Sequence, residues 1–115
     1  MKNQKETIKL KKKKEFRYHD VEVKKRNGKT RIVKHPAYVF LEESNVYIYV
    51  SITHSNNVDG CLVIKLRKNP NPLDDSDSYR VVEIKTGTKE TFGRKLINWE
   101  MDPLDDLDIR KEYKK

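Results

Sequence analysis

Two short polar stretches carry the residue types that acid–base chemistry requires. One contains Thr53 and His54 and directly follows the apolar run "VYIYVSI". The other contains Lys34 and His35 and directly precedes "PAYVF". An imidazole titrates near neutral pH and serves as general acid or base, while a lysine offsets negative charge. Together these residue types suit metal-independent cleavage of RNA through attack by its own 2′-OH.

The elements flanking these stretches predict that they meet. The runs "AYVFLE" and "VYIYVSIT" are joined by "ESN", a turn so short that the two strands must pair antiparallel. The start of one strand then lies beside the end of the other, so Lys34, His35, Thr53 and His54 are expected to form one catalytic pocket. The alternative is structural, with His35 at a strand corner and the other polar residues satisfying loop backbone groups.

The sequence motifs of metal sites, redox pairs and nucleotide-binding loops are absent. The sequence contains no CxxC pair, no HExxH, no GxGxxG and no P-loop, and its histidines have no metal-ligand spacing. The loop "DDSDS" lacks the glycine and distal glutamate of a calcium loop, so we interpret it as solvated. We therefore expect no metal and no cofactor.

The composition predicts one small domain. Of 115 residues, 35% are hydrophobic and 38% are charged, which allows one modest core. The single cysteine, Cys61, excludes an internal disulfide, and its apolar neighbours predict a buried thiol. There is neither a signal-peptide core nor an apolar run near the roughly 20 residues that a membrane span needs. We expect a cytoplasmic protein with no membrane partner.

The positive charge lies almost entirely in the first third of the chain. Residues 1–35 contain 14 Lys and Arg against 4 Asp and Glu, while residues 36–115 contain 12 against 14. This asymmetry predicts a surface for RNA or another nucleic acid, although a solubilising tail is the alternative. The predicted RNA-binding residues are Lys11, Lys12, Lys13, Lys14, Arg17, Lys24, Lys25, Arg26, Lys29 and Arg31.

Residues 1–14 are predicted to form a flexible basic arm, and residues 15–115 a single domain. Asn27-Gly28 predicts a hairpin with a type I′ turn between strands at about Phe16–Lys25 and Lys29–Lys34. Pro36 is expected to begin a new strand after the hairpin.

The second half predicts strands at "CLVIKLRK" and "YRVVEIKT", separated by a loop. Phe92, Leu96 and Trp99 have helical spacing and are expected to be buried against the sheet. Asp102 and Pro103 predict the N-cap and first position of a terminal helix. The fold class is thus mainly β with a C-terminal helix, as a small strongly bent sheet or an SH3-like barrel.

The order of these pieces resembles the PemK/MazF-like toxins, including the ToxN-like branch. A basic hairpin precedes "KHPAYVF", then come "VYIYVSITHS", a long loop, another strand and a terminal helix, over roughly residues 16–113. The resemblance implies an SH3-like barrel and a metal-independent endoribonuclease toxin of a toxin–antitoxin system or mobile element. It also implies dimers, or complexes with an antitoxin protein or RNA.

Carried over by position, the basic residue before the proline strand is Lys34 or His35, the hydroxyl pair is Thr53 with His54 or Ser55, and the hairpin arginine is Arg31 or Arg26. Two features depart from the family pattern. The glycine-proline start of the MazF branch is missing, which argues against a close MazF relative. His54 interrupts the Thr-Ser pair, which leaves the acid and base unassigned.

A second class of function fits the same charges. A non-catalytic binding protein of a phage or mobile element, for example an anti-defence inhibitor, would use the basic face on nucleic acid or on a nucleoprotein target. Toxicity on bacterial expression, relieved by changing His54 or Lys34, distinguishes the two classes.

Overall fold

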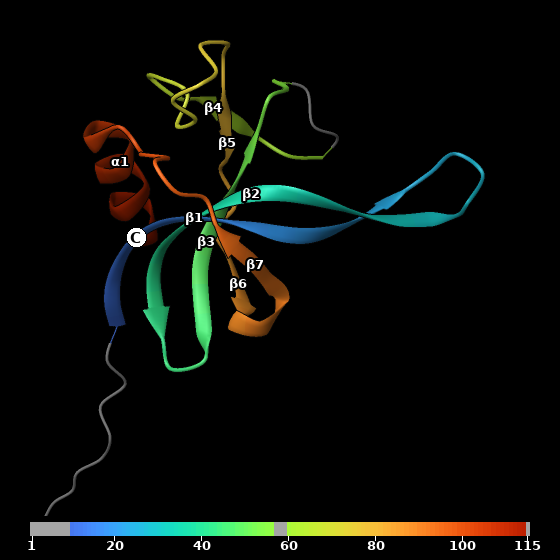
Figure 1. The fold of residues 1–115 in the computed structure, drawn as a ribbon, viewed down its shortest axis with the longest axis horizontal. Coiled ribbons are helices and arrows are strands. Elements are labelled where there is room, and N and C mark those ends of the chain that lie inside the picture. The colour runs from blue at the N-terminus through green and yellow to red at the C-terminus, as the bar shows by residue number, and fades with distance from the viewer. Residues whose placement is uncertain (1–9, 57–59, 115) are drawn as a thin grey trace, which may run out of the picture.

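The computed structural model describes residues 10–56 and 60–114. The chain is mainly β, a seven-stranded antiparallel sheet with one C-terminal helix, which confirms the predicted fold class (Figure 1). The elements are β1 (Leu10–Lys24), β2 (Thr30–Glu43), β3 (Val46–Thr53), β4 (Val63–Lys65), β5 (Tyr79–Val81), β6 (Lys85–Thr88), the 3-10 helix η1 (Lys89–Thr91), β7 (Phe92–Lys95) and α1 (Pro103–Tyr113). No helix in the described ranges is long and apolar enough to cross a membrane.

The sheet is strongly bent. Its strand order is β4-β5-β3-β2-β1-β7, and β6 also pairs with β3. β6 and β7 therefore lie on opposite sides of the β3-β2-β1 unit, yet only η1 separates them in sequence. A Cβ added at Gly87 of β6 would lie 3.1 Å from the ring of Phe92 in β7. The sheet must curl to bring these two elements together.

The central strands bury both of their faces. On one face Tyr38, Phe40 and Val50 belong to a large core that also includes Ile109 of α1. On the other face Val39 and Tyr49 belong to a smaller core that packs against Phe92. The alternation along residues 37–40 of β2 and along β3 follows from the two-residue period of a strand, and a register shift after Val39 interrupts it in β2.

The C-terminal helix begins as its sequence predicts. The Asp102 carboxylate accepts hydrogen bonds from the backbone N–H of Leu104 and Asp105, at 2.8 and 3.3 Å, and Pro103 is the first helical residue. Arg110 ties the helix to the sheet by donating to the backbone oxygens of Phe40 and Lys13, at 2.8 and 2.7 Å.

The predicted helix around Phe92 is wrong. Residues 89–91 form a single 3-10 turn and Phe92–Lys95 forms β7. Phe92 makes edge contacts with Tyr47 and Tyr49, each with ring centroids 5.1 Å apart. Leu96 is buried, but Phe92 and Trp99 are only half-buried. Contacts across the sheet outweigh the helical spacing.

The strands predicted on either side of the acidic loop are shorter than expected. Of "CLVIKLRK" only Val63–Lys65 is a strand, and Cys61 is exposed, so the prediction of a buried thiol is wrong. Leu62 is 76% exposed because it precedes this short edge strand. "YRVVEIKT" is divided into β5 and β6, which pair with successive parts of β3.

The basic hairpin exists, but its turn differs from the type I′ turn predicted. Lys25 N–H donates to Lys29 O at 2.7 Å and Gly28 N–H donates to Lys25 O at 3.0 Å. Gly28 has φ +84°, whereas Asn27 does not have a positive φ. The loop is therefore a three-residue type with glycine in the left-handed position. The resulting register places His19 opposite His35; a two-residue loop would have placed Pro36 there.

Two predicted boundaries are also wrong. Pro36 does not begin a new strand, because β2 continues through it from the hairpin into the body. β3 pairs with β2 only from Ala37 onward. No backbone N–H is therefore needed at position 36 to bond β3, and proline, which lacks one, fits there. Residues 10–14, expected in the flexible arm, begin β1 and pair with β2; residues 1–9 lie outside the described residues.

Candidate nucleic-acid interface

The distal part of the β1–β2 hairpin extends from the body as a two-stranded ribbon, defined here as residues 20–34. Its pairs run from Asp20 opposite Lys34 to Lys24 opposite Thr30, and β1 and β2 pair there only with each other. Figure 1 shows this ribbon projecting well beyond the other strands. At about 3.4 Å per residue, it reaches about 20 Å from the body.

The tip of the ribbon presents cations without counter-ions. The ribbon holds six Lys and Arg against two Asp and Glu. Lys34 makes an exposed ion pair with Asp20, 3.0 Å between Nζ and Oδ1. The other five are exposed and, within the described residues, form no ion pair: Lys24, Lys25, Arg26, Lys29 and Arg31.

The predicted RNA-binding residues nearer the N-terminus divide into two groups. Lys11, Lys12 and Lys14 are exposed on the first part of β1. Lys13 instead pairs with Glu15 at 2.9 Å and with Glu42 at 3.3 Å. These carboxylates raise the pKa of Lys13. Its positive charge is therefore already compensated within the sheet.

Arg17 is similarly occupied. Its Nε lies 3.1 Å from the Glu15 carboxylate, its Nη1 donates to Gly93 O at 3.2 Å, and its guanidinium lies over the Tyr47 ring. These contacts give Arg17 a structural role in the curl of the sheet. It lies on the inner face, away from the exposed tip of the ribbon.

The four predicted catalytic residues lie on two diverging branches. The β2–β3 ladder ends at Ala37 opposite Ser51. Beyond it, Lys34 and His35 continue along the ribbon with β1, while Thr53 pairs with Tyr79 of β5. The antiparallel pairing is confirmed, but the ladder does not extend to the four side chains.

Thr53 and His54 contact the loops on their own side of the molecule. Thr53 Oγ1 accepts from the backbone N–H of Ser55 at 3.2 Å, as expected for a loop cap. The hydroxyl and N–H of Ser76 lower the pKa of Asp74, and the charge of His54 lowers it further. His54 is thus electrostatically linked to the acidic loop. The catalytic role of all four residues stays a prediction.

A polar cluster that we did not predict lies where the ribbon meets the body. His19 Nδ1 lies 3.4 Å from the Tyr49 hydroxyl, and the His19 ring packs on Phe92 with centroids 4.4 Å apart. Burial lowers the pKa of His19; Asp20 opposes this shift and Lys85 adds to it. His35 lies directly across the ladder, on the same face of the sheet. Only the correct hairpin register would have revealed this pair.

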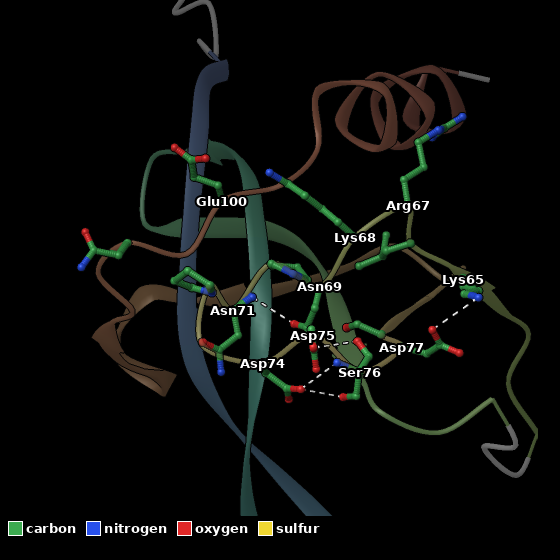
Figure 2. Close-up of a pocket in the computed structure, with 15 residues that line it drawn as sticks. Lys65, Arg67, Lys68, Asn69, Asn71, Asp74, Asp75, Ser76, Asp77 and Glu100 are labelled. Carbon is green, nitrogen blue, oxygen red and sulfur yellow. Dashed lines mark hydrogen bonds and ion pairs between the residues drawn. The ribbon is translucent and has the colours of Figure 1, made fainter.

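A hollow of about 460 Å³ lies beside the acidic loop (Figure 2). Its polar side chains mainly hold the loop together: Asp74 accepts from Ser76, and Asn69 and Asn71 cap the turns that follow them. Lys65 pairs with Asp77 at 3.3 Å. In the described part of the chain, no group of His, Cys, Asp and Glu is arranged to hold a metal ion.

A second hollow, of about 660 Å³, shares Lys68, Asn98 and Glu100 with the first. It lies between β1, the segment after β7 and the start of α1. Its lining combines aromatic and apolar side chains with several cations: Lys14, Glu15, Phe16, Tyr38, Lys68, Lys95, Leu96, Ile97, Asn98, Trp99, Glu100, Met101, Pro103 and Asp106.

No family model, no curated protein and no solved structure matches the chain. The resemblance to the PemK/MazF-like toxins, with the dimer and antitoxin partners that it implies, therefore stays a prediction. The site must be judged on its own geometry.

Proposed function

We propose that this protein binds nucleic acid and that the ribbon is its main docking element. The observation that carries the proposal is the set of five exposed ribbon cations that form no ion pair with any other described residue. A two-stranded β-ribbon is narrow enough to enter a nucleic-acid groove or to follow a strand, so cations from both edges reach phosphates. Each neutralised phosphate releases counter-ions, and binding becomes strongly dependent on salt.

The body supports this proposal by contrast. Three of its arginines are committed to carboxylates: Arg80 to Glu112, Arg110 to Asp106, and Arg67 to Asp105. The ribbon instead gathers five exposed cations on one hairpin, and none of them forms an ion pair with another described residue.

The test compares two matched double variants of the full chain. Lys25→Gln with Lys29→Gln removes two ribbon charges, and Lys111→Gln with Lys114→Gln removes two exposed charges from α1 and its C-cap. The ribbon variant should lose affinity for a short nucleic acid, measured by fluorescence anisotropy. The slope of its log K against log salt should be smaller in magnitude by about 1.4 for a single strand or about 1.8 for a duplex. Equal losses in both variants would show that only net charge matters.

Metal-independent RNA cleavage is a second candidate function, because two histidines are cross-strand neighbours at the base of the ribbon. His19 and His35 occupy opposite positions on neighbouring strands. One imidazole would accept the 2′-OH proton as the 2′-oxygen bonds to phosphorus, and the other, protonated, would give its proton to the departing 5′-oxygen. The products are a 2′,3′-cyclic phosphate and a 5′-hydroxyl end.

An assay in EDTA separates the candidates. If the ribbon-base imidazoles act, His19→Ala and His35→Ala should each lower cleavage about 100-fold or more. If the originally predicted set acts, His54→Ala should do so instead. RNA that stays intact but bound supports the binding protein, and binding only to a protein target would contradict both candidates.

A further inference from the structure

The second hollow combines an aromatic floor with positive charge. Trp99 packs on Phe16 with ring centroids 5.5 Å apart and yet stays half-buried, so part of its ring lines the open space. Phe16 and Tyr38 are buried beneath, with centroids 4.8 Å apart. An aromatic ring that packs on buried rings on one side and is exposed to solvent on the other can stack on a planar ligand.

Two of the carboxylates in the hollow are already neutralised. Glu15 pairs with Lys13 and Arg17, at 2.9 and 3.1 Å. Asp106 pairs with Arg110 at 2.8 Å and accepts a 2.5 Å hydrogen bond from the Tyr38 hydroxyl. Their charges therefore do not repel an anion that enters the hollow.

The cations around the hollow are, by contrast, uncommitted. Lys14, Lys68 and Lys95 are exposed and form no ion pair among residues 10–56 and 60–114. Glu100 is the one lining carboxylate in these ranges for which no ion pair forms. The local balance of uncommitted groups is positive, so an aromatic ligand that carries phosphates fits better than a neutral one.

We propose that this hollow receives an unpaired base of a single-stranded nucleic acid, stacked on Trp99, with its flanking phosphates on Lys14, Lys68 and Lys95. The inference rests on the proposed function and adds a preference for single strands. β1 connects the two sites, because Lys14 borders the hollow and Lys24 lies on the ribbon, about 34 Å away along an extended strand. A duplex keeps its bases paired and can use only the ribbon.

Trp99 is the only tryptophan in the chain, so its fluorescence reports directly on this hollow. The full-length protein is titrated with labelled oligoadenylate RNA, with DNA of the same sequence and with a duplex. Binding is followed by anisotropy and by tryptophan quenching. Both single strands should quench Trp99 and the duplex should not; quenching by RNA alone would assign the site to RNA.

Two variants test the contacts. Lys68→Gln with Lys95→Gln, and separately Trp99→Leu, should each weaken single-strand binding about tenfold and leave duplex binding unchanged. The lysine variant decides the question if Trp99→Leu does not fold, because both lysines are exposed. If single strands bind without quenching Trp99, and the lysine variant binds them with unchanged affinity, the proposal for the hollow is wrong and the ribbon proposal stands. Failure to bind any nucleic acid overturns both.

Discussion

Arg80 in the body and the cations at the ribbon tip differ in burial and in pairing. Arg80 is only 2% exposed and makes a two-pronged contact with Glu112, at 3.0 and 2.8 Å. Lys25 and Arg26 at the ribbon tip are exposed and have no counter-ion among the described residues. A buried charge must be paired to offset its lost hydration, whereas a hydrated charge stays available to a ligand. Position, more than residue type, separates the buried, paired cation from the exposed, unpaired ones here.

The largest contrast should appear on truncating apolar side chains. Phe40 is fully buried in the larger core, so Phe40→Ala should lower the free energy of unfolding by about 3–5 kcal/mol. Ile32 on the ribbon is 60% exposed, and Ile32→Ala should change it by less than about 0.5 kcal/mol. Urea denaturation measures both. Similar losses would mean that the ribbon is part of the folded core.

Ion pairs in the two regions should differ next. Glu112→Gln leaves the Arg80 guanidinium buried without a full counter-charge, which should cost about 3 kcal/mol. Asp20→Asn breaks the exposed pair with Lys34 and should cost less than about 1 kcal/mol. Thermal unfolding in low and high salt checks this prediction. Equal costs would remove the distinction between committed and available charges.

A single hydroxyl on the central strands should have an intermediate effect. Tyr38→Phe removes the hydrogen bond to the Asp106 carboxylate and should cost about 2 kcal/mol. Burial raises the pKa of the Tyr38 phenol, and the bond to Asp106 raises it further, so the group stays protonated at neutral pH. A double-mutant cycle with Asp106→Asn measures the coupling; zero coupling would contradict this contact.

The boundary between the two regions should show a small pH dependence. Because burial lowers the pKa of His19, the unfolded chain binds this proton more readily than the folded chain does. The stability from this residue is full above the ordinary imidazole pKa of about 6.5 and is lost as pH falls toward the lowered folded value. His19→Gln should flatten the stability profile between about pH 5 and 7. An unchanged slope in His19→Gln would contradict this account.

Features fixed by neighbouring residues could be predicted from the sequence. The Asp102 cap depends on residues two and three positions away, and the alternation along β3 depends on the period of one strand. Both predictions are confirmed. The pairing of β2 with β3 also follows from the short turn between them.

Features decided by distant contacts could not be predicted. Phe92, Leu96 and Trp99 fit a helix by spacing, but Phe92 packs on Tyr47 and Leu96 N–H donates to Phe16 O at 2.7 Å. Those partners lie far away in the sequence. A strand pattern and a helix pattern cannot be separated there without them.

The candidate site depends on register in the same way. One residue more in the hairpin loop places His35, rather than Pro36, opposite His19. A shift of one residue also exchanges the faces of a strand. The hairpin itself was therefore predictable, whereas the cluster at its base was not.

The central claim is that the ribbon provides most of the charge that contacts nucleic acid, and the salt dependence of binding tests it most directly. A variant with Gln at all five uncommitted ribbon positions, 24, 25, 26, 29 and 31, is compared with the natural chain from about 50 to 200 mM salt. We predict that the slope of log K against log salt falls by about 3.5 for a single strand, with no change in unfolding temperature. An unchanged slope would place the nucleic-acid contacts elsewhere and contradict the account.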